Sequence, residues 1–166
     1  MEIEKKYKIR QLPENLHNYP RKKIEQGYLC SDPTIRIRKS NEEYILTYKS
    51  KYGLDPELLQ TGCVSNEVEV PLSEEGYEHL KEKVDNYMVY KTRYLIPLGE
   101  GLKAELDIFE ERLKGLVFVE VEFPSADIAV KFKPPEWFGE EISFDHRFKN
   151  TYLSTVENMK ELGENI

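Results

Sequence analysis

The sequence predicts a mainly antiparallel β protein of the α+β class, and two observations support this prediction. The first is alternation: in residues 1–10, Glu2 and Glu4 hold even positions while Ile3 and Tyr7 hold odd ones. Because a strand sends successive side chains to opposite faces, such a segment has one apolar face and one charged face. The second is that these segments follow one another through short connections, which favours an antiparallel meander.

Eight segments carry the strand pattern, namely residues 1–10, 23–30, 34–39, 44–49, 64–71, 87–98, 103–109 and 116–123. Pro13 ends the first segment because proline cannot donate to a strand ladder, and a short helical turn is expected up to Asn18. The longest loop is expected at residues 51–62. Loops of this length are often functional or mobile.

Helices are expected beside these strands. Ser73 followed by two glutamates is typical of a capped helix start, and that helix is expected to run to about Val84. Ser125 begins a second, shorter helix that must end before Pro134. The last quarter of the chain is expected to be helix and loop, with a terminal helix over about 154–162.

Length and composition bound the class of protein. With 166 residues the chain is expected to form one domain over 1–166. The net charge of −7 argues against a general nucleic-acid binder, and no apolar run approaches the roughly twenty residues that span a membrane. Cys30 and Cys63 are expected to be buried or strand-edge thiols. We expect a cytoplasmic protein with no nucleic-acid or membrane partner, and the sequence carries no signal of an oligomeric state.

Like charges recur along the predicted strands. Two charges of one sign enclose a single Ile, Leu or Val seven times, at 2–4, 8–10, 36–38, 67–69, 105–107, 112–114 and 120–122. Composition alone gives about two such triplets. Lys91 and Arg93 add a further basic pair around Thr92. Because like charges repel, these segments need neighbours of opposite sign.

The pattern leaves two arrangements open. If the charged faces point outward, the apolar faces fill the centre of a small barrel. If they point inward, the charges surround a wet lumen, since burying them dry costs several kcal/mol for each unpaired ion. Periodicity alone does not choose between the two.

Short motifs that follow one another over residues 2–150 carry a resemblance to a known family. They are Glu2-Ile3-Glu4-Lys5-Lys6, Ile24-Glu25-Gln26-Gly27-Tyr28-Leu29, Ile35-Arg36-Ile37-Arg38, Tyr48-Lys49, Glu67-Val68-Glu69, Lys91-Thr92-Arg93, Glu105-Leu106-Asp107-Ile108-Phe109, Glu120-Val121-Glu122-Phe123, Trp137-Phe138-Gly139 and Asp145-His146-Arg147-Phe148-Lys149-Asn150. As an ordered set they resemble the CYTH family, the triphosphate tunnel metalloenzymes. The resemblance implies a closed eight-stranded β-barrel, a tunnel with helices packed outside, whose lumen binds a triphosphate and a divalent metal ion.

The resemblance also assigns roles to residues. The expected phosphate-binding residues are Lys6, Arg36, Arg38, Lys49, Lys91, Arg93, Arg147 and Lys149. The expected ligands of Mg²⁺ or Mn²⁺, which prefer carboxylate oxygens, are Glu2, Glu4, Glu67, Glu69, Asp107, Glu120 and Glu122, with Glu105 beside them. The expected catalytic residues are Glu2, Glu4, Lys6 and Lys91. Two positions depart from the family pattern: Ser65 stands where an Arg is usual, and Phe148 where a Tyr is common. Lys8 and Arg10 are expected at the barrel rim, and Arg112 and Lys114 in a solvated turn.

The function implied is metal-dependent hydrolysis of the terminal phosphate of inorganic triphosphate. A thiamine triphosphatase or a class IV-like adenylate cyclase are alternatives within the same resemblance. A barrel that binds polyphosphate or a nucleotide without turnover is a third alternative. The many carboxylates argue against it, because a pure polyanion binder has no use for them.

Overall fold

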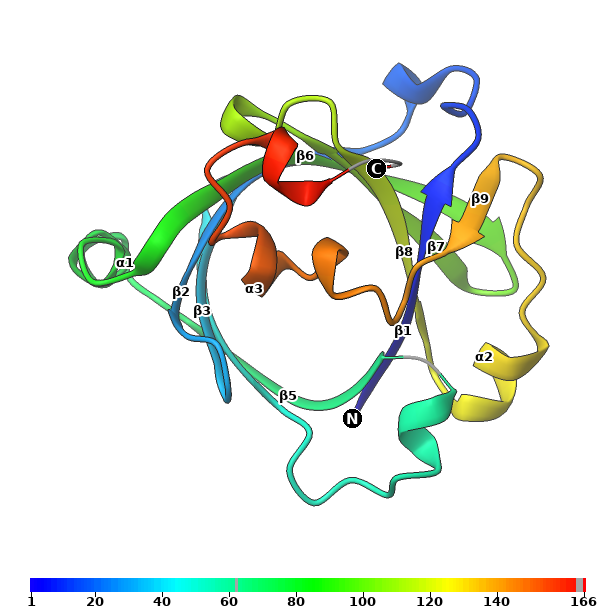
Figure 1. Cartoon of the computed structure of the whole chain (residues 1–166), viewed down its shortest axis with the longest axis horizontal. Helices are drawn as coiled ribbons and strands as arrows, with labels where there is room; N and C mark the ends of the chain where they lie inside the picture. Colours follow the sequence, from blue (N-terminus) through cyan, green and yellow to red (C-terminus); the bar gives the residue numbers. More distant parts are fainter. Residues whose placement is uncertain (62, 164–165) are drawn as a thin grey trace.

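The computed structural model describes residues 1–61, 63–163 and 166, and its strands form a closed barrel (Figure 1). The eight barrel strands are β1 (Glu2–Ile9), β2 (Arg21–Cys30), β3 (Thr34–Ser40), β4 (Glu43–Ser50), β5 (Cys63–Pro71), β6 (Asp85–Gly99), β7 (Leu102–Phe109) and β8 (Val117–Phe123). Their order in the sheet is β5-β4-β3-β2-β6-β7-β8-β1, and β1 pairs with β5 to close the ring. Every pair is antiparallel, which confirms the predicted fold class.

Strand β1 is the seam of this barrel. One of its edges pairs with β8. Its other edge is shared, because β5 pairs with it near Ile3 and β9 (Phe138–Glu141) pairs with it between Tyr7 and Ile9. The sequence analysis assigned no strand to the last quarter of the chain, so β9 was missed. Only four residues long, β9 is too short to show a pattern of alternation.

The apolar faces of the strands point outward, so the hydrophobic core surrounds the barrel wall. Ile3, Leu106, Val119 and Val121 are buried and pack in one cluster with Ala129 of α2 (Ala126–Lys131). A second cluster forms against the C-terminal segment. Of the two arrangements left open by the sequence, the structure therefore has the charged faces inward.

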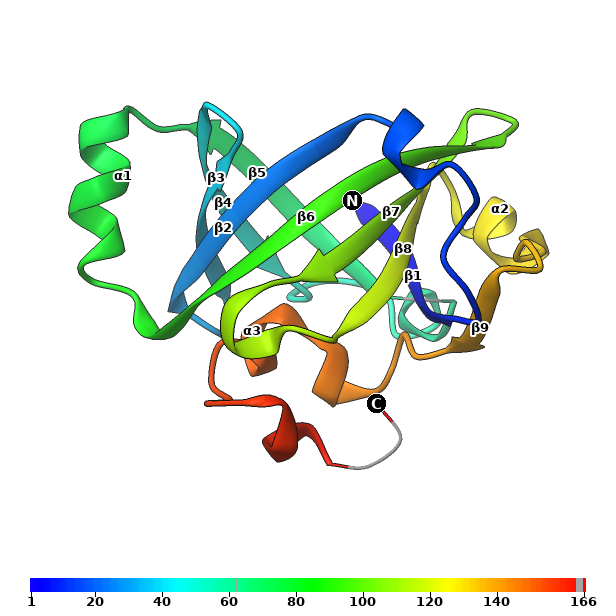
Figure 2. The ribbon, with the colours of Figure 1, turned by 90° about the horizontal axis from the view of Figure 1, so that it is seen from above.

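Helix α1 (Glu74–Lys81) begins as expected, with the Ser73 hydroxyl accepting from the Gly76 N–H at 3.0 Å. It ends before the expected Val84, because strand β6 starts at Asp85. Figure 2 shows α1 and α2 on opposite sides of the barrel. No helix in the described part of the chain combines the length and the apolar character needed to cross a membrane.

The C-terminal segment lies across one mouth of the barrel in both views (Figures 1 and 2). It holds η4 (His146–Phe148), α3 (Asn150–Leu153) and η5 (Met159–Leu162). The remaining short 3-10 helices are η1 (Leu16–Asn18), η2 (Leu58–Gln60) and η3 (Glu111–Leu113). The predicted loop over 51–62 therefore contains η2, and Gly62 lies outside the described residues.

Two expectations for this region were wrong, and Arg112 is one reason for both. Its guanidinium donates to the carbonyl oxygens of Leu153 and Val156, at 3.0 and 2.6 Å, and to that of Met88 at 3.0 Å. These bonds satisfy carbonyls at the end of a helical turn and so stabilise the end of that turn, and only η5 forms within the predicted helix 154–162. Arg112 is also no residue of a solvated turn, although Lys114 is exposed as expected.

Candidate functional site

The lumen of the barrel is a cavity of about 610 Å³, lined by residues of all eight barrel strands and of the C-terminal segment. The even-numbered side chains of β1 face it, as predicted for Glu2 and Glu4. Which ligands such a cavity can bind depends on how the charged side chains are distributed over its lining.

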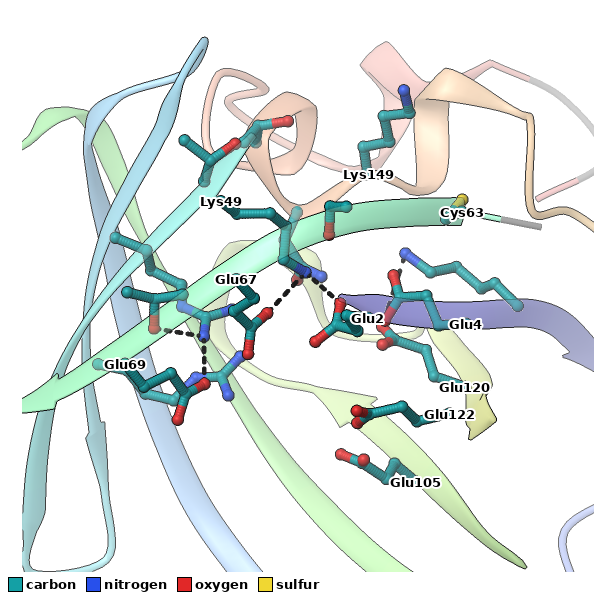
Figure 3. A pocket seen from close by; sticks show the side chains of 18 of the residues that line it. Glu2, Glu4, Lys49, Cys63, Glu67, Glu69, Glu105, Glu120, Glu122 and Lys149 are labelled. Atoms are coloured by element: carbon teal, nitrogen blue, oxygen red, sulfur yellow. Dashed lines mark hydrogen bonds and ion pairs between the residues drawn. The ribbon is translucent and has the colours of Figure 1, made fainter. Parts of the chain in front are cut away.

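One side of the lumen, which we call the acidic wall, consists of Glu2, Glu4, Glu120, Glu122 and Glu105 on β1, β8 and β7 (Figure 3). The strand register places Glu4 directly opposite Glu122, and Glu105 opposite Glu120. Like charges opposite one another in an antiparallel pair are destabilising. The strand register thus leaves two pairs of like charge in the acidic wall.

The facing side, which we call the basic wall, consists of Arg36, Arg38, Lys49 and Arg93 on β3, β4 and β6. The Arg38 guanidinium lies deep in the barrel, and burial together with the nearby guanidinium groups of Arg36 and Arg93 lowers its pKa to about 9. Burial and the neighbouring cations both disfavour the charged form of Arg38, and an anion bound beside it would offset them. This side of the lumen therefore favours an anion.

Arg36 is only partly satisfied by its neighbours. Its Nη2 donates to the Thr47 hydroxyl at 2.9 Å and lies 3.7 Å from the Glu69 carboxylate. Its Nε is buried and has no hydrogen-bond partner among the described residues. Buried polar atoms normally have partners, so an unpaired N–H beside the cavity is consistent with a missing anionic ligand.

Lys49 joins the two walls. Its ammonium lies 2.7 Å from a Glu2 carboxylate oxygen and 3.2 Å from one of Glu67 (Figure 3). Burial lowers the pKa of Lys49, but the carboxylates of Glu4 and Glu2 outweigh burial and raise it above its usual range. Lys49 is therefore charged at any physiological pH.

A buried ion cluster lies behind the lining of the cavity. Asp107 is fully buried; its Oδ1 accepts from Arg93 Nε at 2.7 Å, and its Oδ2 accepts from Lys91 Nζ at 2.8 Å. Arg93 also binds Glu105. Burial lowers the pKa of Lys91 to about 7. In this conformation Asp107 holds two cations instead of offering an oxygen to a metal ion, and Lys91 does not reach the cavity surface.

Two carboxyl groups of the acidic wall, those of Glu4 and Glu2, have raised pKa values. Burial, followed by the charge of Glu120, raises the pKa of Glu4 to about 8. Burial and a hydrogen bond with Glu67 raise that of Glu2 to about 7. Glu120 shifts the other way, since Lys6 and Arg93 outweigh burial and lower its pKa.

The fit of this wall to a divalent cation can be judged from its donor atoms. As they stand, no three His, Cys, Asp or Glu side chains among residues 1–61, 63–163 and 166 are gathered closely enough to hold a metal ion. Yet the Oε1 of Glu120 is buried with no hydrogen-bond partner among the described residues, although Lys6 Nζ lies 3.5 Å away, and the facing carboxylates repel one another. Carboxylates that repel one another spread apart, and carboxylate oxygens are the ligands that hard divalent cations prefer. The donor set therefore fits such an ion.

The other expected site residues are divided between the lumen and its surroundings. Lys6, Glu67, Glu69 and Lys149 line the cavity. Arg147 is not in the lining; its guanidinium pairs with the Asp145 carboxylate at 2.7 Å on the C-terminal segment.

The sequence analysis did not give a site role to several polar residues that the structure places in or beside the lumen. Tyr28 and Thr47 line the cavity, and Gln26 is fully buried next to them. The available signal was strand parity, because Gln26 and Tyr28 share a face of β2. Neutral side chains do not stand out in a search for charge, which is why they were missed.

A closed antiparallel barrel with an acidic and a basic wall facing one lumen defines a class of protein, in which a wet, charged tunnel can hold a polyanion. No protein-family model matches the chain. The chain is similar to an inorganic triphosphatase of Nitrosomonas europaea, with 39% identity over 158 residues that cover 92% of this chain and 96% of the relative. A second inorganic triphosphatase, of Acetivibrio thermocellus, is 33% identical over 144 residues, covering 82% and 83%.

Solved structures agree with these relatives. The crystal structure of the inorganic triphosphatase NE1496 matches with a TM-score of 0.67 and 34% identity, covering 95% of this chain and 97% of that one. The chain thus belongs to the inorganic triphosphatase family, and the predicted resemblance is confirmed. A putative adenylyl cyclase of Hippeastrum, described as having a dominant triphosphatase activity, matches with a TM-score of 0.51 at 16% identity and shows the shared fold alone.

The raised pKa of Glu4 generates a prediction for stability. Between pH of about 4.5 and 8 the folded protein keeps a proton on Glu4 that the unfolded chain releases, so the free energy of unfolding falls as pH rises. Glu4→Gln carries no such proton. In the presence of a chelator it should be more stable than the parent at pH 8 by more than about 1 kcal/mol, and by much less at pH 5.

Denaturant unfolding at the two pH values measures this difference. Glu140→Gln, at an exposed position of β9, is the matched control and should show no pH-dependent gain. A Glu4→Gln protein whose stability relative to the parent is the same at both pH values would contradict the assigned burial of this carboxyl.

Proposed function

We propose that this protein hydrolyses inorganic triphosphate in the lumen of its barrel, with the aid of Mg²⁺ or Mn²⁺. The observation that carries the proposal is the facing of a basic wall and an acidic wall across one cavity. The basic wall supplies the cations that a polyphosphate needs, and the acidic wall supplies carboxylate oxygens. The membership of the chain in a family whose relatives are named inorganic triphosphatases supports the same reaction.

In the proposed reaction, water attacks the terminal phosphorus in line with the bridging oxygen. The P–O bond to that oxygen breaks, and orthophosphate and diphosphate leave. Negative charge moves onto the bridging oxygen and the transferred phosphoryl group. Fixed cations aimed at these atoms stabilise the transition state without having to reorganise.

We assign the phosphate contacts to six cations that line the cavity, namely Lys6, Arg36, Arg38, Lys49, Arg93 and Lys149. Arginines suit this role because the guanidinium fork matches two phosphate oxygens at once. Lys91 would act from behind the lining, where its ion pair with Asp107 fixes the carboxylate that in turn orients Arg93.

We assign the divalent cation to the acidic wall, with Glu2, Glu4, Glu120 and Glu122 as its carboxylates and Glu67 and Glu69 on the side of the basic wall. When bound, the ion would neutralise phosphate oxygens and lower the pKa of bound water. The carboxylates that are not in contact with the ion would accept hydrogen bonds from the attacking water and orient it. Glu105 faces Glu120 and is placed for such a contact.

The substrate preference follows from the extent of the charged lining. Among the described residues that line the lumen, Tyr28 is the one aromatic side chain on which a nucleobase could stack. A nucleoside at one end would displace phosphate from part of the basic wall. Each lost contact to a charged group costs roughly 1–3 kcal/mol.

Inorganic triphosphate should therefore have a higher kcat/KM than ATP, and diphosphate should be a poor substrate because it is too short to reach both walls. Phosphate release from triphosphate, thiamine triphosphate, ATP and diphosphate at equal free Mg²⁺ measures the order. Equal or better kcat/KM for ATP would reject the inorganic substrate. Formation of cyclic AMP and diphosphate without orthophosphate would identify a cyclase.

The metal assignment has its own test in Glu4→Gln. Loss of this charge should lower kcat at saturating Mg²⁺ by on the order of a hundredfold or more, while the fold is kept. Glu140→Gln, which changes an exposed carboxylate outside the barrel, should be as active as the parent. Near-normal turnover in both Glu4→Gln and Glu69→Gln would show that these carboxylates do not carry the metal.

A further inference from the structure

A fully buried glutamine bridges two residues of the basic side of the lumen. Gln26 lies on β2 opposite Arg38 of β3, and its side chain has no solvent-exposed surface. Its amide oxygen accepts from Arg38 Nε at 2.9 Å, and its amide nitrogen donates to the Tyr28 hydroxyl oxygen at 3.0 Å. Both partners line the cavity, whereas Gln26 lies behind them.

The chemistry of the three groups fixes the direction of every hydrogen bond. A guanidinium N–H can only donate, so the Gln26 atom that faces Arg38 must be the oxygen. The amide nitrogen is then left to face Tyr28, and since it too can only donate, the phenol oxygen must accept. Tyr28 has a single O–H proton, which cannot point toward the group that is donating to it.

That proton has no other protein acceptor in the part of the chain that the structure describes. Tyr28 is 3% exposed, and the space next to it that is not filled by protein is the cavity. The hydroxyl is thus turned into the lumen as a donor, beside a guanidinium whose positive charge polarises the amide between them.

We propose that Gln26 is a positioning residue, which sets the Tyr28 hydroxyl and the Arg38 guanidinium to donate together to one phosphate group of the substrate. This role rests on the proposed function, because a phosphate is the ligand to which both groups donate. An alternative in which Gln26 only fills space would not require a particular direction of the Tyr28 O–H.

The test is Gln26→Glu, which keeps the shape of the side chain and reverses the direction of its hydrogen bond with the Tyr28 hydroxyl. A carboxylate still accepts from Arg38, but its second oxygen also accepts, so the Tyr28 proton would turn toward it and away from the cavity. The new negative charge would by itself repel phosphate. Tyr28→Phe separates the two effects, because the repulsion persists without the hydroxyl.

Affinity for sodium tripolyphosphate, measured by calorimetry in the presence of a chelator, and KM and kcat with Mg²⁺ are compared in the four members of this double-mutant cycle. We expect Tyr28→Phe to weaken affinity and raise KM about tenfold. Gln26→Glu should weaken affinity and raise KM by a factor that is about tenfold larger in the parent than in the Tyr28→Phe background. Gln11→Glu, which adds the same charge at an exposed position outside the lumen, should change neither quantity.

An equal cost of Gln26→Glu in both backgrounds would show that its effect is repulsion or packing, and would overturn the proposal. The absence of any cost in the parent would do the same. A parent protein that binds tripolyphosphate, shows the coupling and yet releases no phosphate would reject the hydrolytic function and leave the positioning role standing. Hydrolysis of triphosphate without coupling between the two substitutions would support the hydrolytic function and reject the positioning role.

Discussion

The pairing of charges inside a closed barrel is the constraint on which the rest of this structure depends. Removing an ion from water costs several kcal/mol unless a partner of opposite sign replaces the water. In the lumen, ion pairs offset this cost at Asp107, which lies between Lys91 and Arg93, and at Lys49, which lies between Glu2 and Glu67. At Glu4 no such compensation is sufficient: burial, followed by the charge of Glu120, raises the pKa of this carboxyl.

Placing the charges inside reverses the usual plan of a small barrel. The outward faces are apolar, so the protein needs covering elements, and α1, α2 and the C-terminal segment supply them (Figures 1 and 2). Tyr77 of α1 donates to Glu25 at 2.8 Å, and Arg112 holds the C-terminal segment by its carbonyls. The barrel is thus stabilised mainly from outside, which leaves the lumen free to carry residues chosen for chemistry.

Much of the fold could be predicted because strands with one charged and one apolar face leave a strong signal. The eight strands and the start of α1 at Ser73 follow from local patterns. The direction of the charged faces could not be predicted from periodicity, since a face pointing in and a face pointing out have the same alternation. Only the ordered motifs, read as a family resemblance, favoured the lumen.

Other features depend on contacts between residues far apart in the sequence. Strand β9 exists because β1 has an edge that β5 leaves unpaired, and Arg112 ends the helical turn at α3 from 41 residues away. The charged lining of the site was predicted through the family resemblance, but the positions of Asp107, Lys91 and Gln26 behind that lining arise from packing.

The central claim is that the acidic wall holds a divalent cation opposite the basic wall. Anomalous diffraction from crystals of the protein soaked in Mn²⁺ tests it most directly. The predicted result is a peak within roughly 2–2.5 Å of carboxylate oxygens of Glu2, Glu4, Glu120 or Glu122. Ordered Mn²⁺ that is found solely at carboxylates outside the barrel, such as Glu140, would contradict it.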